Sequence, residues 1–309
     1  MRPVFLCILF CALSQGCDQP SATQATATKP RVVATTTMIG DLVRQIGGED
    51  VALTVIMPAG VDPHSFKPST ADMAEVARAD LVFYNGLHLE GKMVELLEQK
   101  LGGRAFAITR DMPRGKLLAW AEGESGAYDP HVWFDPTLWV DAAKLIGAEL
   151  AKKDPAKAPD YHNRTAAAVE ALMLLDGEVR GKLAMIPAER RVLITSHDAF
   201  SYFGRAYDID VRGLQGISTE TQAGLTNITA AVDHIVAKKI PAIFVESSVP
   251  HSTIERVVAD CKARGVEVTI GGELYSDAMG SPGERPGYAV DTYAGMMRYN
   301  VDLLVNGLR

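Results

Sequence analysis

Short runs of β-branched and other apolar residues alternate along this chain with longer stretches in which apolar residues recur every three or four positions. The short runs predict strands and the longer stretches predict amphipathic helices. Strands are expected at residues 31–36, 51–56, 80–84 and 104–108, and in a second set at 191–195, 208–214, 242–246 and 266–270. Helices are expected between them, among others at residues 39–46, 70–77, 138–152 and 253–263. Strands that alternate with helices in this way indicate parallel sheets.

One stretch without a strand signal separates the two sets of strands. Between Pro155 and Met185, apolar residues recur at steps of three and four, namely Ala166, Val169, Leu172, Met173, Leu175, Val179 and Leu183. This pattern predicts one amphipathic helix, about 40 Å long at 1.5 Å per residue. We therefore predict an α/β fold of two lobes, each with a mainly parallel β-sheet flanked by helices. The predicted boundaries are 31–154 and 187–309 for the lobes and 155–186 for the linker helix that joins them.

The first thirty residues differ from the rest of the chain. Arg2 is followed by the unbroken apolar run Val4–Leu13, which is too short to span a bilayer and predicts a secretory signal peptide over residues 1–16. The small, polar residues 17–30 predict a flexible tether. The segment LSQGC that ends at Cys17 resembles a bacterial lipobox, although its leucine lies one position too far upstream. Cys17 is therefore a lipidation candidate, the alternative being simple cleavage that leaves a spare cysteine.

Composition narrows the class of protein. The chain has 309 residues, of which 47% are hydrophobic, and a formal net charge of −7 with acidic and basic residues interspersed. No run of Lys and Arg offers a surface for nucleic acid. No stretch after the signal peptide is long and apolar enough to span a membrane. We expect an exported monomer in the periplasm or on the outer face of the cytoplasmic membrane.

Three histidines and an aspartate stand where the predicted strands place functional groups. His64 follows the strand at 51–56, His197 follows the strand at 191–195, and Asp277 follows the strand at 266–270 and a Gly-Gly turn. Ligands of such sheets bind beyond the carboxyl ends of the strands. His131 lies in a loop bounded by prolines, DPHVWFDP. Each lobe supplies two of these loops, so an ion bound by all four side chains would bridge the cleft.

Three imidazoles and one carboxylate form a nitrogen and oxygen donor set that suits Zn²⁺, or Mn²⁺ if the carboxylate binds through both oxygens, better than Ca²⁺ or Mg²⁺. Neighbouring aspartates could orient the imidazoles or merely form turns; they are Asp62, Asp129, Asp135 and Asp198. His88 is expected to be exposed near the cleft, and His162, His234 and His251 to be structural or solvent-facing. The spacing of the four ligands forms no local motif, so by itself it is weak support for a metal site.

Several segments, in order, resemble the metal-binding solute-binding proteins of bacterial ABC transporters for zinc and manganese, the ZnuA/TroA-like family. They are MPAGVDPHSFKPS (57–69), YNGLHLE (84–90), DPHVWFDP (129–136), TSHDAFSYFGRAY (195–207), GISTETQAG (216–224), IFVESSV (243–249) and LYSDAMG (274–280). The resemblance covers 31–309. It implies two lobes joined by one long helix, one metal ion in the cleft as transported ligand, and delivery to a membrane permease. It also places His64, His131, His197 and Asp277 on metal-ligand positions.

The resemblance leaves the metal open. Manganese-type relatives often have Glu where this chain has His197, which favours zinc. Many zinc-type relatives carry a His-rich loop before the second ligand, and residues 117–128 contain no histidine. We expect zinc, with manganese a close second, and no enzymatic activity. Two alternatives remain: a secreted zinc-dependent hydrolase, which needs an open coordination position, and a siderophore- or corrinoid-binding protein on a similar fold.

Overall fold

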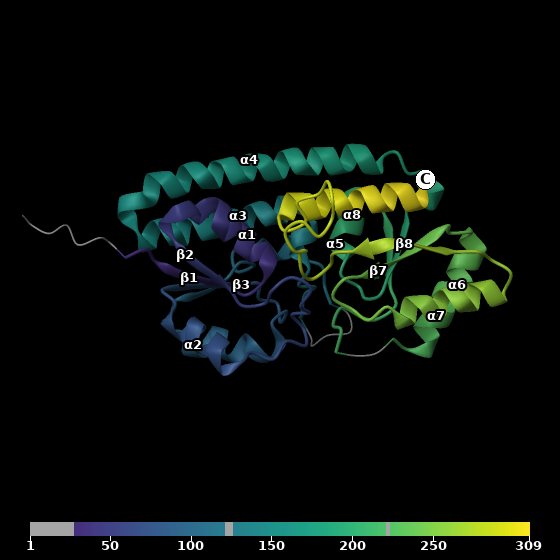
Figure 1. Ribbon diagram of the computed structural model, residues 1–309, viewed down its shortest axis with the longest axis horizontal. Coiled ribbons are helices and arrows are strands. Elements are labelled where there is room, and N and C mark those ends of the chain that lie inside the picture. Colours follow the sequence, from purple (N-terminus) through teal and green to yellow (C-terminus); the bar gives the residue numbers. More distant parts are fainter. Residues whose placement is uncertain (1–27, 121–125, 221–222) are drawn as a thin grey trace, which may run out of the picture.

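The computed structural model describes residues 28–120, 126–220 and 223–309. The predicted signal peptide and most of the predicted tether, including Cys17, lie outside the described residues. Two lobes lie side by side, and the long helix α4 (Ala158–Leu183) runs along both of them (Figure 1). The predicted α/β architecture of two lobes joined by a long helix is confirmed. In the described part of the chain, no helix is both long enough and apolar enough to cross a membrane.

The first lobe is built on a four-stranded parallel sheet with the order β2-β1-β3-β4. Its strands are β1 (Arg31–Ala34), β2 (Ala52–Val55), β3 (Leu81–Tyr84) and β4 (Ala105–Ala107). Helices α1 (Thr37–Gly47) and α3 (Pro136–Lys153) lie with α4 on one side of the sheet, and α2 (Thr70–Arg78) lies on the other (Figure 1). Successive strand residues point to opposite faces, so Val32 and Val33 enter separate hydrophobic clusters.

The second lobe contains two parallel strand pairs, with β5 next to β7. The strands are β5 (Val192–Thr195), β6 (Asp210–Gly213), β7 (Ala242–Glu246) and β8 (Thr269–Leu274). The helices are α5 (Ser201–Tyr207), α6 (Leu225–Lys238), α7 (Ser252–Ala263) and α8 (Tyr293–Leu308). Helix α8 packs against β8 and against α4, while α6 and α7 lie on the far side of the strands (Figure 1).

The strand predicted at 266–270 lies three to four residues later in the structure. Gly271 and Gly272, expected to form a turn, lie inside β8. A Cβ atom at Gly271 would come within 2.6 Å of the Phe244 ring, and one at Gly272 would come within 2.8 Å of the Leu303 side chain. Gly272 also has a φ of +143°, which favours glycine. The two glycines therefore let β8 pass close to its neighbours, and the register with β7 shifts between Ile243 and Val245.

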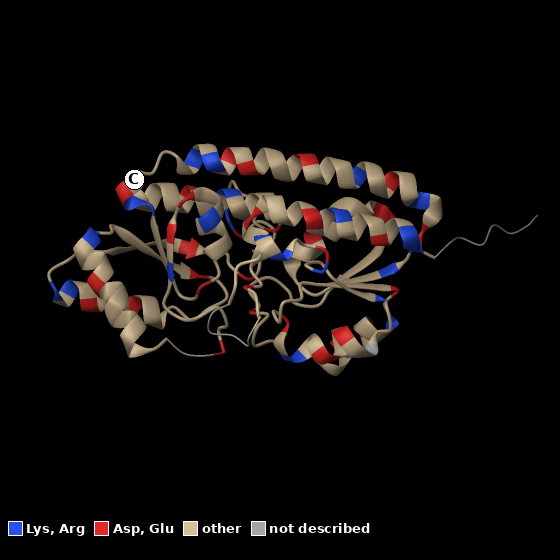
Figure 2. Ribbon diagram, turned by 180° about the vertical axis from the view of Figure 1, so that it is seen from behind, with Lys and Arg blue, Asp and Glu red and all other residues tan. Residues whose placement is uncertain are grey.

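Helix α4 is the predicted linker helix and contains 26 residues. Its inward face differs in part from the predicted stripe. Leu172, Leu175, Val179 and Leu183 are buried, whereas Ala166 and Met173 face solvent. Both basic and acidic residues occur along the helix (Figure 2).

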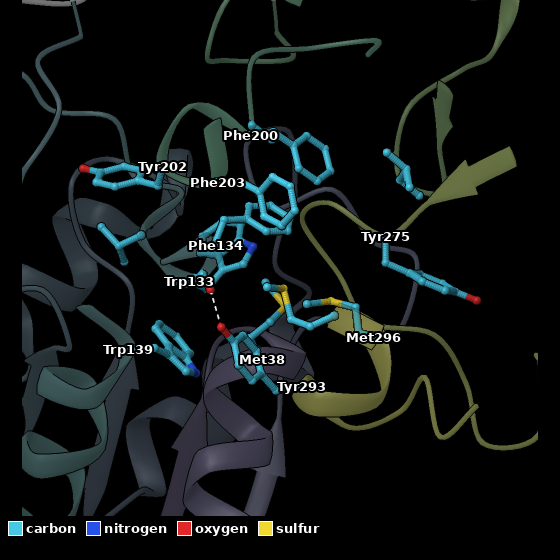
Figure 3. Close-up of a cluster of buried hydrophobic side chains, with 14 of the residues drawn as sticks. Met38, Trp133, Phe134, Trp139, Phe200, Tyr202, Phe203, Tyr275, Tyr293 and Met296 are labelled. Atoms are coloured by element: carbon cyan, nitrogen blue, oxygen red, sulfur yellow. Dashed lines mark hydrogen bonds between the residues drawn. The ribbon is translucent and has the colours of Figure 1, made fainter. Parts of the chain in front are cut away.

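The two lobes share one hydrophobic core and several direct hydrogen bonds. A single cluster of buried side chains contains residues of both lobes, including Phe134 and Phe200, whose ring centroids are 4.3 Å apart. Tyr293 of α8 donates its hydroxyl to the carbonyl oxygen of Trp133 at 2.6 Å (Figure 3). The indole of Trp133 in turn donates to the carbonyl oxygen of Ser276 at 3.0 Å. Protein contacts alone therefore join the lobes at the base of the cleft.

Candidate metal centre

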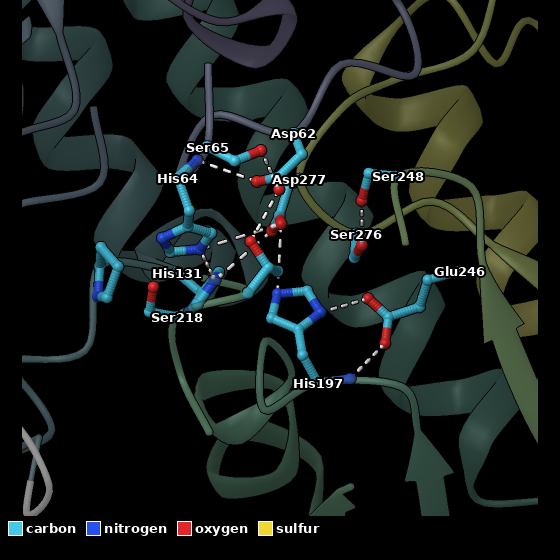
Figure 4. A network of polar contacts seen from close by, with 12 residues as sticks. Asp62, His64, Ser65, His131, His197, Ser218, Glu246, Ser248, Ser276 and Asp277 are labelled. Atoms are coloured by element: carbon cyan, nitrogen blue, oxygen red, sulfur yellow. Dashed lines mark hydrogen bonds and ion pairs between the residues drawn. The ribbon is translucent and has the colours of Figure 1, made fainter. Parts of the chain in front are cut away.

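Four loops bring the candidate ligands together. His64 lies between β2 and α2, His131 directly precedes a short helical turn (Val132–Phe134), His197 follows β5, and Asp277 follows β8. In a parallel sheet the carboxyl ends of the strands lie on one edge, so the loops after β2, β5 and β8 reach toward the same cleft. The four side chains point toward one another there (Figure 4).

The geometry of the cluster is compact. One ligand atom from each of the four residues lies within 4.8 Å of the others. The Nε2 atoms of His64 and His131 are 3.3 Å apart. Both oxygens of Asp277 face the histidines: Oδ1 is 3.4 Å from Nε2 of His131, and Oδ2 is 3.2 Å from Nε2 of His197 and 3.9 Å from Nε2 of His64. Donor atoms at these separations can share a single ion.

The cluster is closed off from solvent. None of the four ligand residues is more than 4% exposed. Within the described part of the chain, both carboxylate oxygens of Asp277 and both ring nitrogens of His197 are buried without a hydrogen-bond partner. Buried polar atoms of this kind are costly unless something satisfies them. Three nitrogen donors and a carboxylate fit a divalent transition metal in that role.

Burial and the neighbouring charged groups shift the pKa values of the side chains in the cluster. Burial, and secondarily the neighbouring His131 and His197, lower the pKa of His64 to about 4 despite the opposing effect of Asp277. Burial also lowers the pKa of His131, but Asp129 and Asp277 outweigh it and raise the value to about 9. For Asp277, burial raises the pKa, but His197 and His131 hold it well below its usual range. The Asp277 carboxylate therefore stays ionised and attracts positive charge into the site.

Two of the predicted orienting aspartates contact ligand residues. Asp129 accepts hydrogen bonds through Oδ1 from both the backbone N–H and ring Nδ1 of His131, at 2.9 and 2.7 Å. Asp62 accepts from the backbone N–H of His64 at 2.9 Å and does not contact its ring. A carboxylate on Nδ1 fixes the ring and leaves Nε2 free for a metal. Asp129 therefore contacts both the ring and the backbone of His131, and Asp62 contacts only the backbone of His64.

A third carboxylate, Glu246, contacts His197, and the sequence analysis did not single it out. Glu246 is the last residue of β7 and is fully buried. Its Oε2 lies 2.6 Å from Nδ1 of His197, and its Oε1 accepts from the backbone N–H of the same residue at 2.9 Å (Figure 4). Burial lowers the pKa of His197, but Glu246 and Asp277 raise it well above its usual value. A charged residue that ends an otherwise apolar buried strand is the sequence signal that could have identified it.

The other candidates lie elsewhere. Asp135 caps α3 through the backbone N–H of Thr137 and faces Arg205, and Asp198 accepts from Ser201. Neither has a direct contact to a histidine ring among the described interactions. His88 is exposed, His162 lies on the outer side of α4, His234 lies on α6, and His251 precedes α7.

A polar pocket of 510 Å³ lies beside the ligand cluster, between the lobes. It is lined by side chains of both lobes, among them Asp62, Ser65, Thr219, Glu220 and Ser248. Thr219 donates to Oδ2 of Asp62 at 2.7 Å, which joins the lobes at this end of the cleft. Because Asp62 also contacts the backbone of His64, the pocket leads to the loop of one candidate ligand.

Comparison with known families agrees with this geometry. Residues 32–307 match the family described as the periplasmic component A of the zinc-uptake complex, ZnuA. The chain belongs to this family. It is 43% identical over 296 residues to the manganese-binding lipoprotein MntA of Bacillus subtilis (strain 168). The aligned region covers 95% of this chain and 94% of MntA. It is 44% identical over 281 residues to the zinc-binding protein TroA of Treponema pallidum (strain Nichols), which covers 91% and 89% of the two chains.

The fold of this ZnuA-family protein matches solved structures of relatives. The periplasmic zinc-binding protein TroA from Treponema pallidum superposes with a TM-score of 0.85 at 43% identity, covering 91% of this chain and 99% of that chain. The family resemblance expected from the sequence motifs is therefore confirmed. Relatives named for zinc and for manganese are almost equally similar, so overall similarity does not separate the two metals.

Proposed function

We propose that this protein captures one divalent transition-metal ion outside the cytoplasmic membrane and delivers it to the permease of an ABC transporter. The supporting observation is the cluster of four buried ligand atoms within 4.8 Å of one another. His64, His131, His197 and Asp277 are the proposed ligands, and the ion is the transported cargo. The names of MntA and TroA, a manganese-binding lipoprotein and a zinc-binding protein, point the same way.

Zinc is the proposed cargo, with manganese a close second. Three imidazoles and one carboxylate oxygen make a tetrahedral set that suits Zn²⁺. Both oxygens of Asp277 face the histidines, so the carboxylate can also bind through both and provide the additional oxygen donor that Mn²⁺ favours. The affinity order for nitrogen-rich sites places Zn²⁺ above Mn²⁺.

The alternative functions fit the site less well. A hydrolytic zinc site keeps an open position for water, whereas here four protein ligands converge and are nearly fully buried. A siderophore or a corrinoid needs a cleft of its own size, and the ligand atoms lie too close together to admit one. We propose that the protein is not an enzyme.

The proposal extends to the parts of the chain around the site. Lobes at 31–154 and 187–309, joined at 155–186, would form a monomer that binds no nucleic acid. Residues 1–16 would be removed as a signal peptide.

Cys17 would then carry a lipid anchor at the start of the tether. Several relatives are named as lipoproteins, which supports an anchor. Labelling of cells with radioactive palmitate should mark the wild type and not Cys17→Ala.

The deciding experiment is the metal content of the purified protein. We expect close to one transition-metal ion per chain by elemental mass spectrometry. Competition between Zn²⁺ and Mn²⁺ for the metal-free protein should favour Zn²⁺. A chain that holds neither ion after reconstitution with each would overturn the proposed function.

A further inference from the structure

Two buried carboxylates contact metal-site histidines from behind, and they do so in different ways. Asp129 uses one oxygen for both donors of His131, its backbone N–H and ring Nδ1. Its second oxygen has no hydrogen-bond partner in the described part of the chain. Glu246 faces His197 with both oxygens: Oε1 accepts from the backbone N–H at 2.9 Å, and Oε2 forms an ion pair with ring Nδ1 at 2.6 Å. The two atoms of this ion pair are not aligned as a hydrogen bond, and neither has another hydrogen-bond partner among the described residues.

We propose that Glu246 is the positioning residue that holds His197 in its metal-binding tautomer, an inference that rests on the proposed function. Oε2 of Glu246 and Nδ1 of His197 are 2.6 Å apart as an ion pair, although they are not aligned as a hydrogen bond. At that distance an unprotonated Nδ1 would bring its lone pair against a carboxylate oxygen, so the contact favours a proton on Nδ1. A neutral imidazole has only one N–H, and Nε2 is then free to bind a metal. Nε2 faces Asp277 at 3.2 Å. Both Glu246 and His197 are fully buried, so the protein itself must fix the tautomer.

The two-oxygen contact makes Glu246 sensitive to a change that barely alters its shape. A glutamine has one acceptor oxygen and one NH₂ donor. The backbone N–H of His197 is always a donor, and Nδ1 is a donor whenever Nε2 binds a metal. In Glu246→Gln, the NH₂ group must therefore oppose a donor in the metal-bound state. The metal-free protein avoids this clash because His197 can move its proton to Nε2, the tautomer that cannot bind.

Glu246→Ala removes the carboxylate without adding an opposing donor. The space it leaves is polar, and a water molecule there can accept from both N–H groups. In this variant His197 can carry its proton on either Nδ1 or Nε2, so the tautomer that binds metal remains accessible. For metal binding we therefore expect glutamine to be worse than alanine, although glutamine is closer in size and shape to the native residue.

Asp129 provides the matched comparison within the same chain. In Asp129→Asn, the amide oxygen can accept from both donors of His131, as Oδ1 does in the native protein. The NH₂ group takes the place of the oxygen that has no hydrogen-bond partner among the described residues. The tautomer of His131 is therefore preserved, and only the charge behind it is lost.

The test is a chelator-competition titration of Zn²⁺ into the wild type, Glu246→Gln, Glu246→Ala and Asp129→Asn. Glu246→Gln should weaken binding by about 10–100-fold, the usual effect of losing the partner of a ligand. Glu246→Ala and Asp129→Asn should each lose less. Thermal unfolding without metal should show Glu246→Gln at least as stable as Glu246→Ala. If Glu246→Gln binds as well as either of the other variants, the proposal is wrong.

A second measurement needs no variant of Glu246. In the zinc-bound wild type, ¹⁵N chemical shifts of the imidazoles should show His197 protonated on Nδ1, with His197→Ala used to assign the signal. A proton on Nε2 would overturn the inference. Failure of the proposed function is distinguishable, because the wild type itself would then bind no metal in the same titration.

Discussion

Asp277 is the only charged residue among the four proposed ligands. With three neutral imidazoles, it alone reduces the charge of a bound divalent ion from +2 to +1. Its two oxygens also reach different histidines, at 3.4 Å and 3.2 Å. The residue therefore affects both the affinity of the site and its preference between metals.

Asp277→Ala should weaken the binding of Mn²⁺ more than that of Zn²⁺, by about tenfold or more, equivalent to roughly 1.4 kcal/mol. Zn²⁺ can keep the three histidines and add a water molecule. Mn²⁺ prefers oxygen donors and binds nitrogen-rich sites weakly, so it depends more on the carboxylate. Titration of both ions into wild type and variant measures the difference. Equal losses would mean that Asp277 acts only as a general counter-charge, and no loss would mean that it is not a ligand.

His64→Ala and His197→Ala should each weaken Zn²⁺ binding by more than the 10–100-fold that is typical when only the partner of a ligand is lost. The two residues lie in loops after β2 and β5, so their removal should leave the circular dichroism spectrum unchanged. His162→Ala is the control, since His162 is exposed on α4 and should have no effect. Wild-type affinity in both ligand variants would contradict the assignment.

The sequence suggests the four candidate ligands by their loops after predicted strands and by the family resemblance, and the structure brings their ligand atoms within 4.8 Å of one another. His197 follows its strand closely, whereas a longer loop separates His64 from β2. For Glu246, the charge at the end of the apolar strand AIFVE marks the residue, but the strand pattern does not indicate which side chain it contacts. Its role depends on β7 lying next to β5, where His197 follows. That contact joins residues 49 positions apart, and local pattern carries no information about it.

At the scale of elements, a helix or strand is predicted more accurately from the sequence when its pattern of apolar residues repeats over a longer segment. Helix α4 repeats its apolar pattern over several turns, so its existence and length were predicted well. The predicted position of strand β8 was wrong because the pair Gly271–Gly272 is typical of a turn. In the structure both glycines lie within the strand and pack closely against Phe244 and Leu303. The positions within a short strand are thus decided by its neighbours rather than by its own residues.

The contact between α3 and α4 depends on Gly147. A Cβ atom there would come within 2.0 Å of Thr165 Oγ1 and 3.1 Å of its Cβ. We expect Gly147→Ala to lower the free energy of unfolding by about 1–3 kcal/mol, because helices packed this closely must move apart. Urea unfolding followed by circular dichroism measures the change.

Gly177→Ala on α4 is the matched control. Nothing lies within 4 Å of a Cβ atom at Gly177, and the residue is exposed. This substitution should instead raise the free energy of unfolding by about 0.5–1 kcal/mol, because alanine favours the helix over glycine. Similar effects of the two substitutions would show that the α3–α4 contact is not as close as described.

At the scale of the whole molecule, the assignment of two ligands to each lobe suggests that the metal ties the lobes together. The contacts favour a different view. Asp277 belongs to the second lobe, but its loop is bonded to the first through Trp133, which donates to Ser276, and Thr37, which accepts from the backbone of Met279. Helix α5 is similarly joined, since Tyr202 donates to the carbonyl oxygen of Asp129. These bonds and the shared core involve none of the four ligand side chains.

We therefore expect metal removal to leave the arrangement of the lobes unchanged. A cleft that is closed mainly by its ligand would open when the ligand leaves, whereas here α4 and the shared core join both lobes without any of the four ligand side chains. Small-angle X-ray scattering of the protein with Zn²⁺ and with a chelator should give the same radius of gyration within error, and Asp277→Ala should give it too. Hydrogen exchange should instead change mainly around Asp62 and Thr219, where a single side-chain bond joins the lobes next to the His64 loop. A clearly larger radius without metal would mean that the ion, and not the protein interface, sets the distance between the lobes.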